Sequence, residues 1–388
     1  MEFSLAPRIR RQRKAERGKW KGTRSSLARF SFLFSLSYFL FATALAAQSP
    51  GKPSEAAEKY LRSEFRDNSP GAAVLIARGE RVIFRGNYGL AVTKTKTPIT
   101  SDTVFDIGSI SKSFTAAAIL LLAEEGKLQL SDPLTRHLPE ISRFKQTITL
   151  HHLLTHTSGL PHFEPEEDRT RRQWPPEEIV RWHSRQSKLQ FAPGERYDYC
   201  NGGYVLLSVV VEKITGKPFA EFVRERIFAP LGMQRTSLRL ASAQISNRAT
   251  GYRVADDSAF LIISDSDGRN VQGDGGIQST VEDLLRYALS WRTASLLKPD
   301  TIRLALTPAT LNDGKRIAYG YGWGLSRLDG HVMVSHDGRA RGFRAYLAMF
   351  PGEQEMLTVV VLANQRHTET GTIALKLARM FLASEAPK

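Results

Sequence analysis

The tetrapeptide Ser109-Ile110-Ser111-Lys112 places a hydroxyl and an amine three residues apart. On a helix, residues at this spacing lie on one face, one turn apart. A serine hydroxyl becomes a useful nucleophile when a neighbour takes its proton, and a lysine in a partly desolvated site can do so. A helix start at Ser109 would add free N–H groups and a positive dipole end. The segment therefore indicates nucleophilic catalysis by Ser109 with Lys112 as its proton partner.

The S-x-x-K spacing alone is not specific, because it occurs four times in the chain. The other three pairs begin at Ser49, Ser142 and Ser295. Only Ser109 precedes a long helix, expected over 110–125, with an apolar face along it. Gly108 is expected to let a bulky substrate approach the backbone. Taken alone, the segment also fits a helix-capping serine beside a solvated lysine.

A second candidate segment is Tyr199-Cys200-Asn201, which follows a turn at Pro193-Gly194 and precedes a helix expected from Gly203. Residues two apart in an extended segment face the same side, so Tyr199 and Asn201 could share one pocket. A phenol close to a lysine ammonium is expected to have a lowered pKa and to act as a base. The alternative is a packed tyrosine and a helix-capping asparagine.

A third candidate is His336-Asp337-Gly338, directly after an apolar strand at 332–335. A strand edge that contains Gly338 would let a substrate backbone lie alongside it. The N–H of Arg339 could then join the N–H of Ser109 in an oxyanion hole. The alternative is a histidine in an ordinary turn at a strand end.

The elements that must position these residues come from both ends of the chain. Apolar runs predict a hairpin at 72–77 and 82–84 and three later strands at 332–335, 345–350 and 357–363. Apolar residues at helical spacing predict a terminal helix over 370–382 and helices at 149–154, 176–184, 203–215, 219–227 and 281–288. The expected fold is α/β: one antiparallel sheet from both chain ends, flanking helices, and an inserted, mainly helical lobe. A cleft between two lobes is a usual place for a small-molecule site.

Taken in order, five blocks resemble the class C β-lactamase-related serine hydrolases. They are FDIGSISKSFTAAAILLLAEEGKLQLSDPL, LLTHTSGL, FAPGERYDYCNGGY, GDGGIQSTVEDLLRY and HDGRARGFRAYLAMFP. This family includes class C β-lactamases, D-alanyl-D-alanine peptidases, D-aminopeptidases and related esterases. The resemblance covers about residues 55–385 and implies a β-lactamase-like fold in a single domain of two lobes, over residues 48–388.

The resemblance also implies roles for individual residues. The catalytic positions would be the nucleophile Ser109, its proton partner Lys112 and the general base Tyr199. Substrate-binding positions would be Asn201, His336, Gly338 and Arg339. The block His156–Leu160, expected to be helical, and the loop Gly275-Gly276 match structural signatures of the family.

Two departures bear on the substrate. Class C β-lactamases begin the third motif with a lysine that helps bind the β-lactam carboxylate, whereas this chain has His336, which is mostly neutral at pH 7. We therefore expect an esterase or peptidase, acting on a small molecule or a peptidoglycan-like peptide, rather than a strong β-lactamase. Arg339 and Arg341 could replace the lysine as a carboxylate clamp. Cys200 stands where the family often has serine, and we expect its thiol to pack; a catalytically silent scaffold is the alternative to an enzyme.

Residues 1–47 are interpreted as an address rather than as part of the fold. They combine a basic stretch, an apolar run at 30–47 and the small residues Ala44-Leu45-Ala46, which is typical of a secretory signal peptide. We therefore expect an exported, periplasmic or secreted protein. Alternatives are an uncleaved membrane anchor at 30–47 or an organellar transit peptide.

Charge and cysteine content exclude other classes of protein. Of the net charge of +15, residues 1–47 contribute +8, from ten Lys/Arg and two Glu, and the remaining +7 is ordinary for an enzyme. We therefore expect no nucleic-acid partner. With one cysteine and no zinc-type spacing of histidines, we expect no disulfide, metal or other cofactor.

Overall fold

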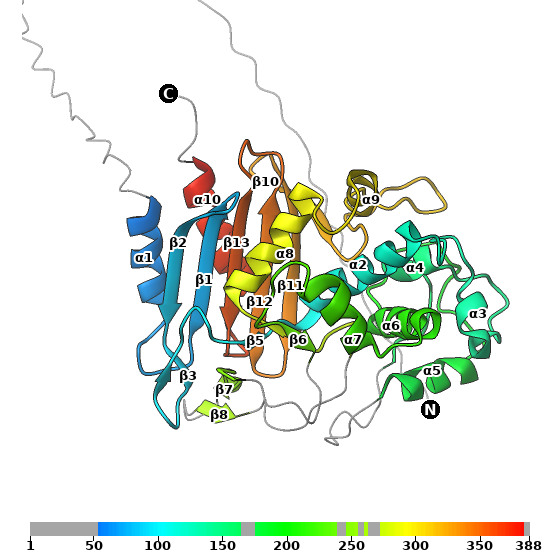
Figure 1. Cartoon of the computed structure of the whole chain (residues 1–388), viewed down its shortest axis with the longest axis horizontal. Helices are drawn as coiled ribbons and strands as arrows, with labels where there is room; N and C mark the ends of the chain where they lie inside the picture. The colour runs from blue at the N-terminus through cyan, green and yellow to red at the C-terminus, as the bar shows by residue number, and fades with distance from the viewer. Residues whose placement is uncertain (1–52, 164–174, 239–245, 255–259, 263–271, 384–388) are drawn as a thin grey trace, which may run out of the picture. The chain divides into compact units, whose positions relative to one another are not determined.

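Strands from both ends of the chain pair into one six-stranded antiparallel sheet, which confirms the expected architecture (Figure 1). The strand order is β10-β11-β12-β13-β1-β2. The bounds are Gly324–Leu328 for β10, His331–Ala340 for β11, Phe343–Phe350 for β12, Leu357–Ala363 for β13, Ala72–Arg78 for β1 and Arg81–Tyr88 for β2. The computed structural model describes residues 53–163, 175–238, 246–254, 260–262 and 272–383. The leader and anchor predictions for residues 1–47 lie outside these described residues.

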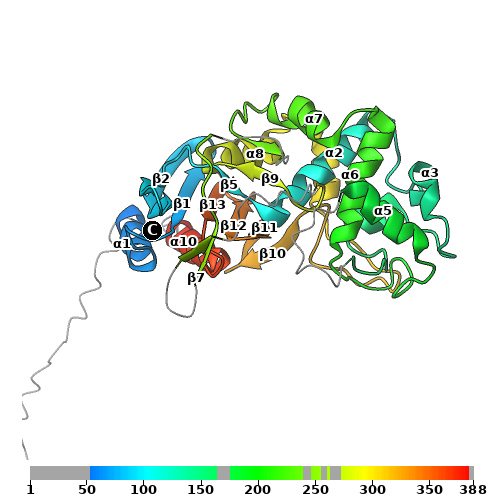
Figure 2. The same ribbon diagram turned by 90° about the horizontal axis from the view of Figure 1, so that it is seen from below.

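Helices cover both faces of the sheet (Figure 2). Helices α1 (Pro53–Glu64) and α10 (Thr370–Leu382) pack on one face, and α8 (Val281–Thr293) packs on the other, against β13 and β1. β1 and β13 are buried along their whole length, because alternate side chains enter different cores. This explains why both strands are continuous apolar runs rather than alternating ones.

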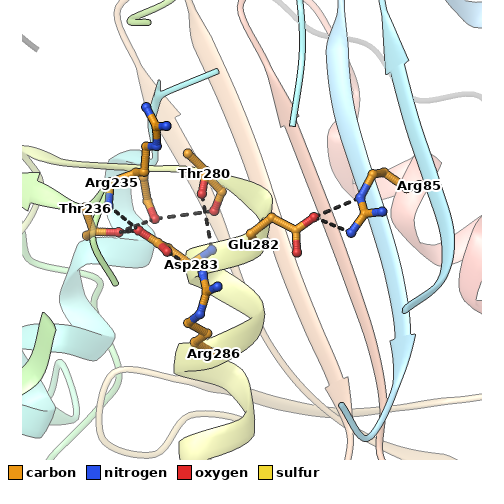
Figure 3. A network of polar contacts seen from close by, with 8 residues as sticks. Arg85, Arg235, Thr236, Thr280, Glu282, Asp283 and Arg286 are labelled. Carbon is orange, nitrogen blue, oxygen red and sulfur yellow. Dashed lines mark hydrogen bonds and ion pairs between the residues drawn. The ribbon is translucent and has the colours of Figure 1, made fainter. Parts of the chain in front are cut away.

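Polar contacts hold α8 in place over the sheet (Figure 3). Thr280 caps the helix by accepting the Asp283 N–H at 3.2 Å. The buried Asp283 carboxylate in turn accepts the Thr236 hydroxyl at 2.9 Å. Glu282, the residue before Asp283, pairs with Arg85 of β2 at 2.6 Å. The first turn of α8 is thereby tied to the sheet and to the chain at Thr236.

The rest of the described chain is mainly helical. The helices are α2 (Ser111–Glu124), α3 (Leu134–His137), α4 (Leu150–Leu154), α5 (Pro176–Arg185), α6 (Asn201–Thr215), α7 (Phe219–Val223) and α9 (Pro299–Ala305). Short turns of 3-10 helix lie at Gly108–Ile110 and Pro139–Ile141, and a π-helical turn lies at Arg224–Phe228. Small sheets join β3 (Leu90–Val92) to β4 (Thr97–Pro98), β9 (Ile277–Ser279) to both β5 (Phe105–Asp106) and β6 (Ser237–Leu238), and β7 (Tyr252–Val254) to β8 (Phe260–Ile262).

Helix α2 differs from its predicted form. It was expected to bury one face, but every residue from Ser111 to Leu122 is buried. The small residues Ala116, Ala117 and Ala118 let neighbouring elements, including α6, α7 and the π-helical turn at Arg224–Phe228, pack closely around the helix. The turn Gly108–Ile110, which contains Ser109, is therefore attached to one of the most enclosed elements of the described chain. None of the described helices is long and apolar enough to cross a bilayer.

Candidate active site

Ser109 lies in the 3-10 turn Gly108–Ile110, which leads directly into α2. Gly108 has φ +52, a left-handed conformation that favours glycine, and its N–H donates to Asp106 Oδ1 at 2.9 Å. A Cβ on Gly108 would lie 2.5 Å from the backbone nitrogen of Arg339. The expectation that Gly108 makes room for substrate is therefore wrong, because the glycine instead lets strand β11 lie against the turn Gly108–Ile110.

Lys112 is completely buried, and its amine reaches Ser109. Its Nζ donates to Ser109 Oγ at 3.2 Å and to the carbonyl oxygen of Asp274 at 2.9 Å. Burial lowers the Lys112 pKa from 10.5 to about 8, although the negative charge of Asp274 opposes the shift. A useful fraction of this amine is therefore neutral near pH 7, as a proton acceptor must be.

Tyr199 lies close to both groups. The Lys112 Nζ is 4.8 Å from the centroid of the Tyr199 ring, and Tyr199 and Ser109 line the same pocket. Burial raises the Tyr199 pKa above its usual 10, and the Ser109 hydroxyl only partly offsets this. The predicted lowering of the phenol pKa is therefore wrong, because desolvation outweighs the nearby cation.

Asn201 is exposed at the first residue of α6, two residues after Tyr199. Cys200 between them is the N-cap of α6 and is buried, as expected of a packing residue. Burial raises the pKa of its thiol. Tyr197, two residues before Tyr199, faces the same pocket. The two-residue spacing that relates Tyr199 to Asn201 also relates Tyr197 to Tyr199. The sequence could therefore have predicted that Tyr197 faces the same pocket.

His336 lies behind the pocket wall rather than in it. It is buried, with Nδ1 2.6 Å from the carbonyl oxygen of Asp337 and Nε2 3.1 Å from the Tyr319 hydroxyl. Since Nδ1 faces an acceptor, the ring carries its proton there, and Nε2 accepts from Tyr319. Burial, reinforced by the Lys112 charge, lowers the His336 pKa to about 4. His336 is therefore neutral at pH 7 and offers no cation to a carboxylate.

Gly338 also belongs to the wall. A Cβ there would lie 2.0 Å from the Ile107 carbonyl oxygen, so glycine is needed for β11 to pack beside the turn that contains Ser109. The expected open edge is present, since β10 pairs with β11 only as far as Gly324–Ser335 and stops before His336. Arg339 lies on this edge and against Gly108, the residue before Ser109.

A pocket of about 430 Å³ lies where the Ser109 turn, the Tyr199 segment and β11 meet. It is lined by Ser109, Tyr197, Tyr199, Asn201, Asp337 and Arg339. Four of these were predicted from sequence, whereas Tyr197 and Asp337 were not. His336, Gly338 and Arg341 are not among the lining residues. Asp337 and Arg339 form an exposed ion pair, with Arg339 Nε 3.3 Å from Asp337 Oδ2.

Two loops support the site from behind. The loop at Gly275-Gly276 is fixed to α2, because Thr115 Oγ1 donates to the Gly273 carbonyl at 2.7 Å and the Ile277 N–H donates to Ser111 Oγ at 3.2 Å. His156–Leu160 was expected to be helical, but it is an irregular turn that follows α4. Within the described part of the chain, no cluster of three or more His, Cys, Asp or Glu residues could hold a metal ion.

The fold and the pocket define a β-lactamase-related serine hydrolase, and comparison with known proteins gives the family. The Beta-lactamase family model matches residues 53–382, and the chain belongs to this family. It is 32% identical over 340 residues to "Penicillin-binding protein 4*" of Bacillus subtilis (strain 168), covering 80% of this chain and 71% of that protein.

Two further relatives widen the comparison. The chain is 29% identical over 324 residues to a D-aminopeptidase of Gluconobacter oxydans (strain 621H), covering 80% of this chain. It spans only 58% of that longer protein. Among solved structures, the octameric penicillin-binding protein homologue from Pyrococcus abyssi is similar with a TM-score of 0.74 and 28% identity, over 85% of this chain and 76% of that one.

Proposed function

We propose that this chain hydrolyses amides or esters through an acyl-enzyme on Ser109. The observation that carries the proposal is the 3.2 Å hydrogen bond from Lys112 Nζ to Ser109 Oγ, made by an amine whose pKa is lowered to about 8. When Lys112 is neutral, it accepts the Ser109 proton as Oγ bonds to the substrate carbonyl carbon. This gives a tetrahedral oxyanion and a Lys112 ammonium.

Tyr199 suits the second proton transfer. Because burial raises its pKa, its phenol keeps a proton that it can donate to the leaving nitrogen or oxygen as that bond breaks. The Lys112 ammonium returns a proton to the phenolate, which leaves the acyl-enzyme and a neutral pair. In deacylation, water adds to the acyl carbon while Lys112 takes its proton, and Ser109 Oγ leaves and is reprotonated.

The oxyanion is expected to form between two backbone donors. Ser109 opens the turn before α2, and the backbone of Arg339 lies against Gly108 immediately next to it. The N–H groups of Ser109 and Arg339 are therefore the best candidates to bind the developing charge. Loss of one such donor typically lowers turnover by about 10²–10³.

We infer a substrate with a free amino group near the scissile carbonyl, which would exchange with Arg339 as the partner of the Asp337 carboxylate. The histidine of the third motif is buried and neutral, so the carboxylate of a β-lactam finds no cation there. By contrast, the Asp337 carboxylate lines the pocket beside the rings of Tyr197 and Tyr199, and ammonium groups bind both carboxylates and aromatic faces. We therefore propose an aminopeptidase or amino-acid esterase, and the D-aminopeptidase relatives support this choice.

A substrate panel tests this specificity together with the variant Asp337→Asn. We expect the wild-type protein to cleave D-alanine p-nitroanilide faster than its N-acetyl derivative, L-alanine p-nitroanilide or nitrocefin. Asp337→Asn removes the partner of the substrate ammonium, so kcat/KM for the free amine should fall about tenfold. The rate with the N-acetyl substrate should stay within about threefold.

Asp329→Asn is the matched control, because it removes an exposed carboxylate that pairs with Arg379 rather than lining the pocket. It should leave all rates unchanged. Preference for nitrocefin, or an equal loss on both anilides in Asp337→Asn, would contradict the proposed substrate class.

We also propose that residues 1–47 direct export of the protein. Their basic stretch, apolar run and small residues before Gln48 support a cleaved signal peptide. Edman sequencing of the protein expressed with this leader in a bacterial host should give a first residue at or near Gln48. Recovery in the membrane fraction with residues 30–47 retained would favour the anchor instead.

A further inference from the structure

The segment that carries Tyr199 has no regular secondary structure of its own between Leu189 and Cys200. Its position depends on four hydrogen bonds to the turn at 156–160. The four bonds run from Gln190 N to Gly159 O (2.8 Å), Gly194 N to Thr157 O (2.8 Å), Asp198 N to His156 O (2.8 Å) and Cys200 N to His156 Nδ1 (3.0 Å). The turn therefore acts as a template for the catalytic tyrosine.

His156 makes both of the bonds that flank Tyr199. Its carbonyl oxygen accepts from Asp198, the residue before Tyr199, and its Nδ1 accepts from Cys200, the residue after. The His156 ring also packs on the Tyr199 ring, with centroids 4.2 Å apart and planes at 33°. The backbone and the ring of Tyr199 are thus held by the same residue.

The surroundings of His156 fix its orientation and its tautomer. The side chain is 1% exposed and also contacts the rings of Tyr204 and Tyr319, with centroids 4.9 and 5.0 Å away. Because Nδ1 accepts the Cys200 N–H, the ring proton must be on Nε2, and Nε2 has no hydrogen-bond partner among the described residues. His156 has φ +57, a left-handed conformation that asparagine also tolerates.

We propose that His156 is the positioning residue for Tyr199, and that an acceptor at its Nδ1 position holds the phenol in the pocket that Ser109 also lines. This inference rests on the proposed function, in which Tyr199 exchanges a proton at Ser109. His156 does not line the pocket, so its effect on catalysis would act through Tyr199 and not through contact with the substrate.

Two variants, His156→Asn and His156→Gln, test the proposal, because both carry the same side-chain amide and differ only in where its oxygen lies. In His156→Asn the carbonyl oxygen occupies about the position of Nδ1 and can accept the Cys200 N–H, whereas in His156→Gln the oxygen lies one carbon further out. We expect His156→Asn to keep kcat within about fivefold of wild type. His156→Gln should lose about 10²-fold in kcat with KM nearly unchanged, because small misplacements of catalytic groups have effects of this size.

His152→Asn is the control for general damage. His152 sits in the capping box of α4, four residues before His156, and its side chain makes no hydrogen bond or ring contact with residues 189–200 in the described structure. Rates are divided by the folded fraction from chemical unfolding. Equal activity of His156→Asn and His156→Gln, or a loss in His152→Asn as large as in His156→Gln, would overturn the positioning role.

The acyl-enzyme proposal and the positioning role of His156 can fail independently, and acylation by a fluorophosphonate tells them apart. If a fluorophosphonate does not acylate the wild-type protein at all, the acyl-enzyme proposal fails first. If the wild type is acylated and the two amide variants are acylated at the same rate, the acyl-enzyme proposal survives and the role of His156 is refuted.

Discussion

Ser109→Ala is expected to abolish turnover, with kcat falling by at least about 10⁴-fold on any substrate that the wild type cleaves. Alanine removes the oxygen that forms the covalent bond, and Lys112 cannot replace it as a nucleophile because its side chain is completely buried. Stopped-assay rates on p-nitrophenyl esters and D-alanine p-nitroanilide measure the loss. The folded state should be unaffected, since Ser109 lies in a turn at the pocket surface.

Ser142→Ala is the matched control for this substitution. Ser142 begins another S-x-x-K tetrapeptide, but it is exposed and does not line the catalytic pocket. Its replacement should leave kcat within about twofold of wild type. If Ser109→Ala retained more than a tenth of the wild-type rate, another residue would have to be the nucleophile.

Lys112→Met is expected to lose activity and gain stability at the same time. Without the amine, only solvent can accept the Ser109 proton. General-base catalysis typically contributes about 10²–10⁴-fold to the rate, so kcat should fall by a factor of this size. Methionine has a similar length and no charge, so it fills the same space without a desolvation cost. The variant should therefore unfold at a higher temperature although it is nearly inactive.

The size and sign of the stability change follow from the Lys112 pKa. The Lys112 pKa is about 8 in the folded protein and 10.5 for an unperturbed lysine, which represents the unfolded chain. Burying the ammonium therefore costs roughly 3 kcal/mol of folding stability below pH 8. Losing the hydrogen bond to the Asp274 carbonyl offsets about 1 kcal/mol of the gain. Between pH 8 and 10.5 the unfolded chain holds a proton that the folded chain has released. Wild-type stability therefore rises with pH, and the difference in stability between Lys112→Met and wild type becomes smaller.

Urea unfolding at pH 7 and pH 10 measures this gap, and Lys145→Met, which removes an exposed lysine, is the control. Over the same range, wild-type kcat/KM should rise with pH and level off above about 8 as Lys112 loses its proton. A Lys112→Met protein less stable than wild type at pH 7, or a wild-type rate that falls from pH 6 to 8, would contradict this account.

Much of the architecture could be predicted because it depends on local patterns. The runs at 72–77, 345–350 and 357–363 are apolar enough to specify strands, and the sheet buries them on both faces. The spacing of Ser109 and Lys112 was sufficient to place their side chains together, since one turn of helix fixes that geometry.

Other features depend on contacts that no local pattern contains. β10 is short and carries only two apolar side chains, Leu325 and Leu328, and it was missed, although the Asp329-Gly330 turn beside it, with φ +49 and +91, is a recognised hairpin signal. The glycines at 108 and 338 looked like space for substrate, yet they make space for Arg339 and Ile107. The direction of the Tyr199 pKa shift required its burial to be known.

Peptide mapping of the acylated protein tests the central claim most directly. After reaction with a fluorophosphonate and trypsin digestion, the peptide Thr97–Lys112 contains three serines, at positions 101, 109 and 111. Tandem mass spectrometry of this peptide should place the whole adduct on Ser109. An adduct on Ser101, Ser111 or a different peptide, or a wild-type protein that stays unlabelled, would contradict the assignment of Ser109 as the nucleophile.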